Sequence, residues 1–338
     1  MRIGIVNDLG IATEALRRVL ARRADFRVAW AAASGEDAVA HCARDTPDLV
    51  LMDLVMPGMN GVEATRRIMA ASPCPILVVT VSVGANAAMV FEAMGHGALD
   101  ATDMPSLGGE ENGGADKLLA KIDLIGRLTA APPRPLPARA PASGAAHPLL
   151  AIGASAGGPS AVARLLEGLP ADFAGAVAVI QHIDEKFAPG MADWLGRYSR
   201  LPVRIANTGD TLQPGRVLLA ATNDHLSLRA DARLDYVREP AQLPYRPSVD
   251  VFYKSVADHW RGPIVGVLLT GMGRDGAAGL RLLRDQGHHT IAQDRATSAV
   301  YGMPKAAAEL DAAVEILPLD RIAARVRDLF AQTQTASP

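Results

Sequence analysis

A strand that runs directly into a glycine-rich turn and then into a helix most constrains the fold of this 338-residue chain. Residues 149–158 read Leu-Leu-Ala-Ile-Gly-Ala-Ser-Ala-Gly-Gly, and apolar residues recur at helical spacing after Pro159. Small neighbours leave Ser155 clear of the backbone, and free N–H groups at the helix start can face an oxyanion. The stretch predicts a nucleophile elbow, unless it is only a phosphate-binding loop or a plain strand-to-helix turn. A catalytic role requires a base and an acid elsewhere.

Strands and helices alternate along residues 1–128. Apolar runs predict strands at 3–6, 27–32, 48–52 and 76–80, and a poorly apolar stretch near 99–102 predicts a fifth, with helical patterns between them. This order predicts a flavodoxin-like parallel α/β domain whose chemistry lies at the carboxyl ends of the strands. Asp8, Asp53 and Thr80 stand at three of those ends. Asp8 and Asp53 offer the oxygen ligands that Mg²⁺ prefers, and a carboxylate beside such a cation can accept a phosphoryl group.

Three further regions follow. Residues 129–148 are rich in proline and alanine without apolar periodicity, which predicts an extended linker. Residues 149–332 predict a doubly wound, mostly parallel α/β domain, and 333–338 a short tail. A helix from Gly190 should bury a face that includes Tyr198. Strands are expected at 149–152, 176–180, 264–270, 290–293 and 314–317, and short strands, which could be antiparallel, at 215–220, 226–228 and 234–237.

Two strand ends in the second domain supply candidate partners for Ser155. His182 follows a buried strand directly, whereas the other histidines lie outside this domain or in helices, turns and loops. Asp275 follows the most apolar strand through a Gly-Met-Gly turn, where it could also cap a helix, instead of or in addition to serving as the acid. The same turn offers backbone N–H groups, with Met272 the first candidate for an oxyanion donor. His182 would accept the proton of Ser155, and Asp275 would orient and stabilise the imidazolium.

Composition excludes several classes of protein. The net charge is −2 and no run of Lys and Arg is present, so we expect no nucleic-acid partner. The longest apolar run, 264–269, is far too short to cross a bilayer, so we expect no membrane insertion. Two cysteines, Cys42 and Cys74, and no signal-peptide pattern at the start predict a reduced, cytoplasmic setting.

The motifs together resemble a known family. Residues 1–128 resemble the receiver domain of two-component response regulators. Ile-Gly-Ala-Ser-Ala-Gly-Gly, Gln-His, Arg246-Pro-Ser-Val-Asp, Leu-Thr-Gly-Met-Gly-Arg-Asp-Gly and Tyr301-Gly-Met-Pro are similar to motifs of CheB-family chemotaxis methylesterases. The receiver domain looks closer to the Wsp-type surface-sensing branch, in which the receptor system drives a diguanylate cyclase.

The resemblance implies a function for each half of the chain. A histidine kinase would phosphorylate Asp53, with Mg²⁺ held by Asp8, Asp53 and the Val55 carbonyl, and Thr80 would act as the switch. The second domain would hydrolyse glutamate γ-methyl esters on chemoreceptor-like proteins without a cofactor, often together with deamidation of glutamine. Its implied triad is Ser155, His182 and Asp275, with the Met272 N–H in the oxyanion hole.

Three positions depart from the family pattern. Asn7 stands where a second acid is usual, and Met104 stands where a lysine is expected. Loss of that lysine would remove a contact to the phosphate worth about 1.5–3 kcal/mol. Ala156 replaces a threonine that commonly follows the nucleophile. The main alternative is a non-catalytic response regulator that binds receptors, and a transcription regulator is disfavoured because no helix-turn-helix follows the linker.

Overall fold

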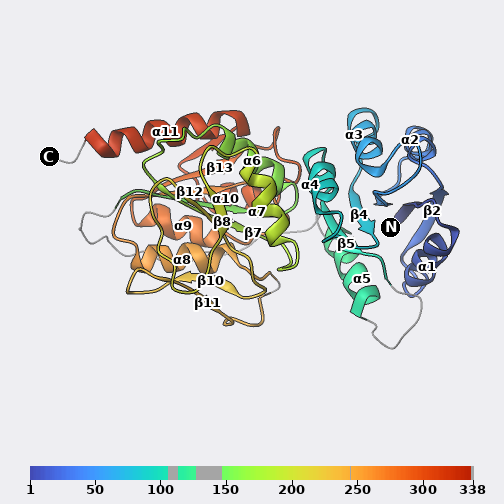
Figure 1. Ribbon diagram of the computed structural model, residues 1–338, viewed down its shortest axis with the longest axis horizontal. Helices are drawn as coiled ribbons and strands as arrows, with labels where there is room; N and C mark the ends of the chain where they lie inside the picture. The colour runs from blue at the N-terminus through green and yellow to red at the C-terminus, as the bar shows by residue number, and fades with distance from the viewer. Residues whose placement is uncertain (106–112, 127–146, 244, 336–338) are drawn as a thin grey trace. The chain divides into compact units, whose positions relative to one another are not determined.

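The computed structural model describes residues 1–105, 113–126, 147–243 and 245–335. These residues form two compact units, divided between Ala130 and Ala131 (Figure 1). Most of the predicted linker at 129–148 lies outside the described residues, so its conformation stays a prediction. The tail predicted from residue 333 begins inside the last helix, which continues to Thr335. Within the described part of the chain, no helix has the length and apolarity needed to cross a membrane.

The first unit is a five-stranded parallel sheet with the order β2-β1-β3-β4-β5. This is the flavodoxin-like order, in which the direction of winding changes between β1 and β3. All five predicted strands are confirmed within one or two residues at each end. The elements are β1 Arg2–Val6, α1 Gly10–Leu20, β2 Arg27–Ala32, α2 Gly35–Arg44, β3 Leu49–Met52, α3 Gly61–Ala71, β4 Ile76–Thr80, α4 Ala87–Gly95, β5 Asp100–Asp103 and α5 Gly113–Gly126.

The second unit is a seven-stranded parallel sheet, ordered β14-β13-β12-β6-β7-β9-β8, with a separate β10-β11 hairpin. Its first half comprises β6 Leu149–Ala154, α6 Gly158–Glu167, β7 Ala176–Gln181, α7 Ala188–Gly196, β8 Val203–Ile205, β9 Val217–Leu219, β10 His225–Leu228 and β11 Leu234–Val237. Its second half comprises α8 Val249–His259, β12 Ile264–Leu268, α9 Ala277–Asp285, β13 His289–Gln293, α10 Met303–Glu309, β14 Glu315–Leu317 and α11 Leu319–Thr335.

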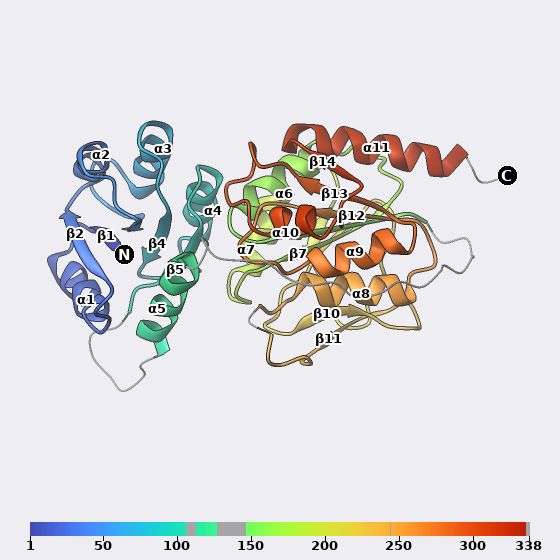
Figure 2. The same cartoon turned by 180° about the vertical axis from the view of Figure 1, so that it is seen from behind.

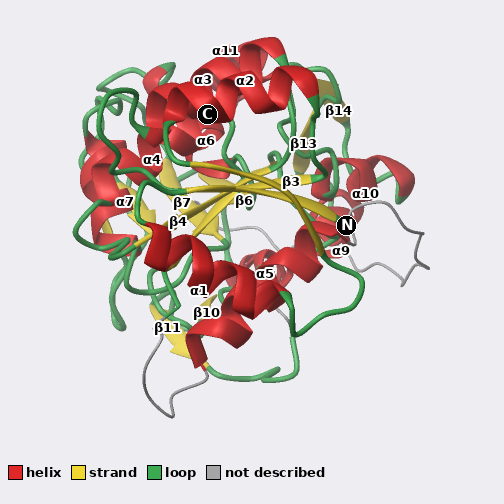
Figure 3. Cartoon of the chain, turned by 90° about the vertical axis from the view of Figure 1, so that its right-hand side faces the viewer, coloured by secondary structure: helices red, strands yellow, loops and turns green. Residues whose placement is uncertain are grey.

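Helices cover both faces of this second sheet. α6 and α11 lie on one side and α8 and α9 on the other (Figures 1 and 2). Figure 3 shows β6 and β7 beneath α6 and α11. Every residue of β6, β7 and β12 is buried, which explains why these strands are apolar apart from Gln181 at the end of β7. The predicted doubly wound α/β class is therefore confirmed.

Three local predictions for the second unit were incomplete or wrong. The strand expected at 215–220 is β9, which pairs in parallel with β7 and β8, whereas β10 and β11 pair antiparallel with each other. β8 was missed because it is three residues long and carries an arginine. Tyr198 lies beyond the end of α7 and is 44% exposed, so it is not part of the buried face of that helix.

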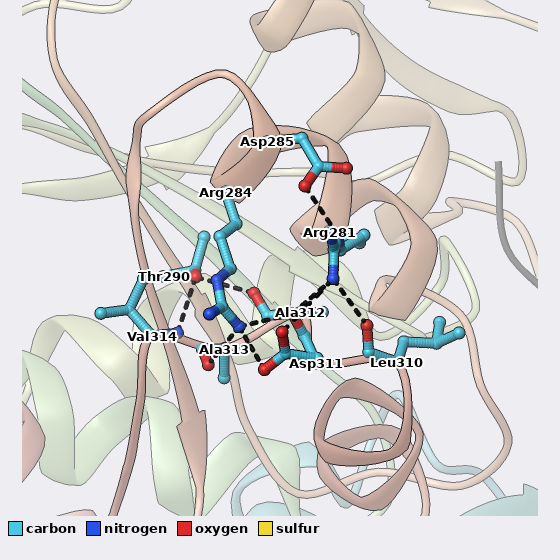
Figure 4. A network of polar contacts seen from close by, with 9 residues as sticks. All are labelled: Arg281, Arg284, Asp285, Thr290, Leu310, Asp311, Ala312, Ala313 and Val314. Atoms are coloured by element: carbon cyan, nitrogen blue, oxygen red, sulfur yellow. Dashed lines mark hydrogen bonds and ion pairs between the residues drawn. The ribbon is translucent and has the colours of Figure 1, made fainter. Parts of the chain in front are cut away.

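Arg284 of α9 fixes the turn between α10 and β14 (Figure 4). Its guanidinium donates to the carbonyl of Asp311 at 2.5 Å, to the Asp311 carboxylate at 2.6 Å and to the carbonyl of Ala313 at 3.1 Å. Asp311 has a φ of 49°, a left-handed conformation that non-glycine residues adopt at a cost. The hydroxyl of Thr290 donates to the carbonyl of Ala312 at 2.7 Å and holds the turn from β13.

We expect Arg284→Ala to lower the free energy of unfolding by about 1.5–3 kcal/mol. The substitution removes the guanidinium that donates to the Ala313 carbonyl and leaves the carbonyl of the strained Asp311 with Arg281 as its charged donor. Urea denaturation measures the change, with Arg327→Ala on the exposed face of α11 as the control. Equal denaturation midpoints for the two variants would contradict this role of Arg284.

Candidate active site and phosphorylation site

Three neighbouring strands bring the predicted residues of the second unit to one edge of its sheet. The register pairs Ala154 of β6 with Gln181 of β7, so Ser155 and His182 are the next residues on adjacent strands. The His182 N–H donates to the Ala154 carbonyl at 3.1 Å. On the other side, the Ser155 N–H donates to the carbonyl of Thr270, just beyond β12, at 3.1 Å. The loop that carries Asp275 therefore begins beside Ser155.

The turn after Ser155 has the geometry of an elbow. Gly157 has a φ of 72°, in the left-handed region that favours glycine, and precedes the first residue of α6. A Cβ on Gly158 would lie 2.1 Å from Oε1 of Gln181, so a larger residue does not fit there. Ser155 is 9% exposed at the start of this turn.

His182 is paired with Asp275. Its Nε2 lies 2.7 Å from Oδ2 of Asp275, and both side chains are buried. Its Nδ1 is buried and has no hydrogen-bond partner in the described chain. No hydrogen bond joins Ser155 to His182 in the described chain, but active-site hydrogen bonds are often long in the absence of substrate. Because Nε2 is engaged, Nδ1 is the nitrogen left to accept a proton from Ser155.

The N-terminus of α8 surrounds the carboxylate of Asp275. Its two oxygens accept the Ser248 hydroxyl at 2.7 Å, the Val249 N–H at 2.6 Å and the Asp250 N–H at 3.2 Å. Burial alone would raise the pKa of Asp275, but the hydrogen bond and charge of His182, followed by the α8 donors, lower it. Asp275 therefore caps a helix, as the alternative reading held, but this helix is α8 and not the one that follows it.

A second carboxylate lies behind Asp275. Asp250, in the first turn of α8, accepts the Gly279 N–H at 2.6 Å. Burial and then the negative charge of Asp275 raise the pKa of Asp250 to about 7. Asp250 thus binds its proton more tightly in the folded chain than in the unfolded chain. The contribution of Asp250 to the stability therefore falls as the pH rises from about 4 to about 7.

We expect Asp250→Asn to remove this fall in stability. Above pH 7, the free energy of unfolding of the variant should exceed that of the wild type by about 2–4 kcal/mol. The amide keeps an acceptor for Gly279 and carries no charge beside Asp275. Urea denaturation from pH 4 to pH 8 measures the difference. Asp258→Asn, on the exposed side of the same helix, is the matched control. A pH profile of Asp250→Asn parallel to that of the wild type would refute the raised pKa.

Backbone donors lie on both sides of Ser155. A Cβ on Gly271 would lie 2.8 Å from Cβ of Ser155, so the loop after β12 runs against the serine and Met272 follows one residue later. Within the described residues, the N–H groups of Met272 and Ala156 have no hydrogen-bond acceptor, whereas the Ser155 N–H is engaged by Thr270. Ala156 lacks the hydroxyl of the threonine that is common at this position. Its carbonyl accepts from the Thr270 hydroxyl at 3.0 Å. The free N–H groups are those that an oxyanion would require.

Sequence reasoning missed one aromatic residue of this site. The ring of Tyr245 stacks on the imidazole of His182, with centroids 4.3 Å apart and planes 5° apart. Tyr245 belongs to the loop before α8 and precedes the Arg246-Pro motif. A single tyrosine in a loop has no periodicity to mark it, although its place beside a family motif was a usable signal.

The first unit gathers Asn7, Asp8 and Asp53 where β1 and β3 end. Asp53 is 5% exposed, and its Oδ1 accepts the Leu54 N–H at 2.7 Å. The Asn7 amide donates to Oδ2 of Asp53 at 3.0 Å, so the residue that replaces the usual acid orients the carboxylate instead. Burial, with a further contribution from the charge of Asp8, raises the pKa of Asp53. A bound cation would offset both effects.

Thr80 ends β4, next to Asp53, and Met104 follows the neighbouring strand β5. The buried hydroxyl of Thr80 accepts from the Asn86 amide at 3.0 Å. The Met104 N–H donates to the Thr80 carbonyl at 2.8 Å. The position where the resemblance expects a lysine is therefore a backbone neighbour of the predicted switch residue.

The fold and these two sites define a response regulator whose receiver domain is joined to an α/β domain with a Ser-His-Asp constellation. A family model described as CheB methylesterase matches residues 150–326, and one described as response regulator receiver domain matches residues 3–103. The chain belongs to the CheB methylesterase family.

Named relatives and a solved structure agree with this assignment. The chain is 61% identical over 332 residues to protein-glutamate methylesterase/protein-glutamine glutaminase 4 of Burkholderia thailandensis, which covers 96% of both chains. It is 60% identical over 331 residues to enzyme 2 of that name from Burkholderia orbicola, covering 97% of this chain and 99% of the relative. The crystal structure of the Thermotoga maritima CheB methylesterase catalytic domain matches with a TM-score of 0.52 and 31% identity, covering 55% of this chain and all of that one.

Proposed function

We propose that this protein is a phosphorylation-regulated protein-glutamate methylesterase. Its substrates are glutamate γ-methyl esters on chemoreceptor-like signalling proteins, and it also deamidates glutamine. The observation that carries the proposal is the meeting of Ser155, His182 and Asp275 at adjacent strand ends, with His182 and Asp275 2.7 Å apart. A carboxylic ester hydrolase of this kind needs no cofactor for the ester step.

The first half of the reaction forms an acyl-enzyme. Oγ of Ser155 attacks the γ-carbonyl carbon while Nδ1 of His182 takes its proton, and Asp275 stabilises the imidazolium. The N–H of Met272, with that of Ala156, donates to the oxyanion of the tetrahedral intermediate. The ester C–O bond then breaks, and the methoxy oxygen takes the proton from His182 to leave as methanol.

Water completes the reaction by the same route. His182 takes a proton from the water as its oxygen attacks the acyl carbon, and the bond to Ser155 breaks as the serine regains a proton. The products are a glutamate side chain and free enzyme. With a glutamine substrate, the leaving nitrogen takes the proton and departs as ammonia, so one site serves both activities.

The receiver domain supplies the regulation. A histidine kinase transfers a phosphoryl group to Asp53, and Thr80 moves toward it. The donor set of Asp8, Asp53 and the Val55 carbonyl suits Mg²⁺, because all three ligands are hard oxygens and two are carboxylates. When bound, the cation supplies positive charge to the phosphoryl oxygens. Met104 lacks the charge of a lysine, so the phosphoryl contact on that side is weaker than the family pattern provides.

We expect a small-molecule phosphodonor with Mg²⁺ to raise methanol release from methylated receptor by about 5- to 150-fold, the range of a 1–3 kcal/mol coupling. Asp53→Asn should abolish this response, whereas Asp37→Asn on the exposed face of α2 should keep it.

Removal of residues 1–146 should raise basal activity, because the unphosphorylated receiver is proposed to restrain the catalytic domain. Equal basal activity in the truncated and full chains would contradict that restraint.

The proposed setting is the cytoplasm, with a cognate histidine kinase and methylated chemoreceptor-like proteins as partners. We propose no nucleic-acid contact and no membrane insertion. The Wsp-type assignment stays a prediction. Assays of methanol release with receptors of the two pathways distinguish chemotaxis from surface sensing.

A further inference from the structure

Two contacts, a hydrogen bond and a ring stack, hold the imidazole of His182. One edge is fixed through Nε2, by the 2.7 Å contact to Asp275. One face is covered by Tyr245, whose ring is nearly parallel to it at a centroid distance of 4.3 Å. A hydrogen bond at one nitrogen fixes the direction of that atom but leaves the ring free to rotate about the bond. A parallel aromatic face removes that rotation.

The position of Tyr245 is itself well defined. A Cβ on Gly273 would lie 3.0 Å from the Tyr245 hydroxyl oxygen, and Gly273 has a φ of 81°. The tyrosine therefore reaches from the imidazole to the glycine turn that follows Met272. Burial, and then the charge of Asp275, raise the pKa of Tyr245, so its ring stays neutral. A neutral aromatic ring presents a negative face to a cation.

We propose that Tyr245 is a positioning residue for the hydrolysis, whose aromatic face fixes the plane of the His182 imidazole and stabilises the imidazolium formed when Ser155 attacks. This inference rests on the proposed function. The fixed plane keeps Nδ1 directed at Ser155 while Nε2 stays on Asp275. The gain is larger after proton transfer than before it, because a cationic ring is attracted to the aromatic face more strongly than a neutral ring.

Substitution of Tyr245 in the full-length protein tests this role. Tyr245→Leu should lower kcat for methanol release by about 3- to 30-fold, with KM within twofold of the wild type. The rate at which a fluorophosphonate labels Ser155 should fall by a similar factor, since labelling needs the same activated hydroxyl. Tyr245→Phe keeps the face and should restore kcat to within twofold. Tyr198→Leu, at an exposed tyrosine of the same unit, is the control.

Three results would overturn the inference. These are an unchanged kcat in Tyr245→Leu, a loss confined to KM, or a Tyr245→Phe variant as slow as Tyr245→Leu. Thermal unfolding identifies a variant that does not fold, and Tyr245→Met then provides a second variant without a ring. The failure of the proposed function gives a different result, because the wild type itself would release no methanol and take up no label.

Discussion

Ser155→Ala is expected to lower methanol release from methylated receptor by about 10⁴- to 10⁶-fold. The substitution removes the atom that forms the bond to the acyl carbon in the proposed mechanism. It leaves the His182–Asp275 pair and the free Met272 N–H in place, so substrate should still bind. Release of ammonia from receptor glutamine should fall with it, since both reactions pass through the same acyl-enzyme.

Ser160→Ala is the matched control for this variant. Ser160 lies in the first turn of α6, the helix that begins three residues after Ser155, and its hydroxyl donates to the carbonyl of Gly157 at 3.1 Å. It should keep full activity and full labelling of Ser155 by a fluorophosphonate. Methanol release that survives in Ser155→Ala would refute the role of Ser155 as the nucleophile. A wild type that releases no methanol and takes up no label would instead favour a receptor-binding protein without catalysis.

Local sequence patterns were sufficient to predict the framework of both units. Uniformly apolar runs marked the buried strands, because parallel strands covered on both faces cannot alternate. Once the strands were placed, residues such as Ser155 and His182 followed from position alone, since the carboxyl ends of parallel strands meet at one edge. The same reasoning located Asp8 and Asp53. β8 was missed because an arginine interrupts its three residues, so that no apolar run marks it.

Contacts between distant loops could not be predicted in this way. Tyr245 reaches His182 from a loop 63 positions further along the chain, and no local pattern encodes that approach. The orientation of the His182 imidazole is another feature that no local pattern predicts. Two nitrogens could have faced Asp275, and only the structure shows that Nε2 does so and that Nδ1 is left for Ser155.

Asp275 illustrates how one residue can serve the fold and the site together. Its sequence position suggested an orienting acid, a helix cap or both. The structure gives its carboxylate both contacts, because His182 and the first turn of α8 lie on it at once. The N-terminus of a helix favours an anion, and an anion is what a protonated imidazole requires. The donors of the helix therefore add to the effect of His182 in keeping the acid ionised.

This double role makes Asp275 the second position where substitution should have a large effect. We expect Asp275→Asn to lower kcat by about 10³- to 10⁴-fold, because the neutral amide no longer stabilises the imidazolium. Asp275→Ala should be as inactive and also less stable, by about 2–5 kcal/mol, since it strands buried donors of Ser248, Val249 and His182. Methanol release and urea denaturation measure the two effects separately.

The pH dependence of stability should separate the same two variants from the wild type. The pKa of Asp275 is lowered by folding, so its contribution to stability is present above pH 4 and is lost as the pH falls through the lowered value. Both variants should lack that acid-side loss, whereas Asp258→Asn, at an exposed carboxylate of α8, should keep it. If Asp275→Asn retained more than a tenth of the wild-type kcat, a group other than Asp275 would have to stabilise the imidazolium. Tyr245 would be the first candidate, because its ring stacks on the imidazole of His182.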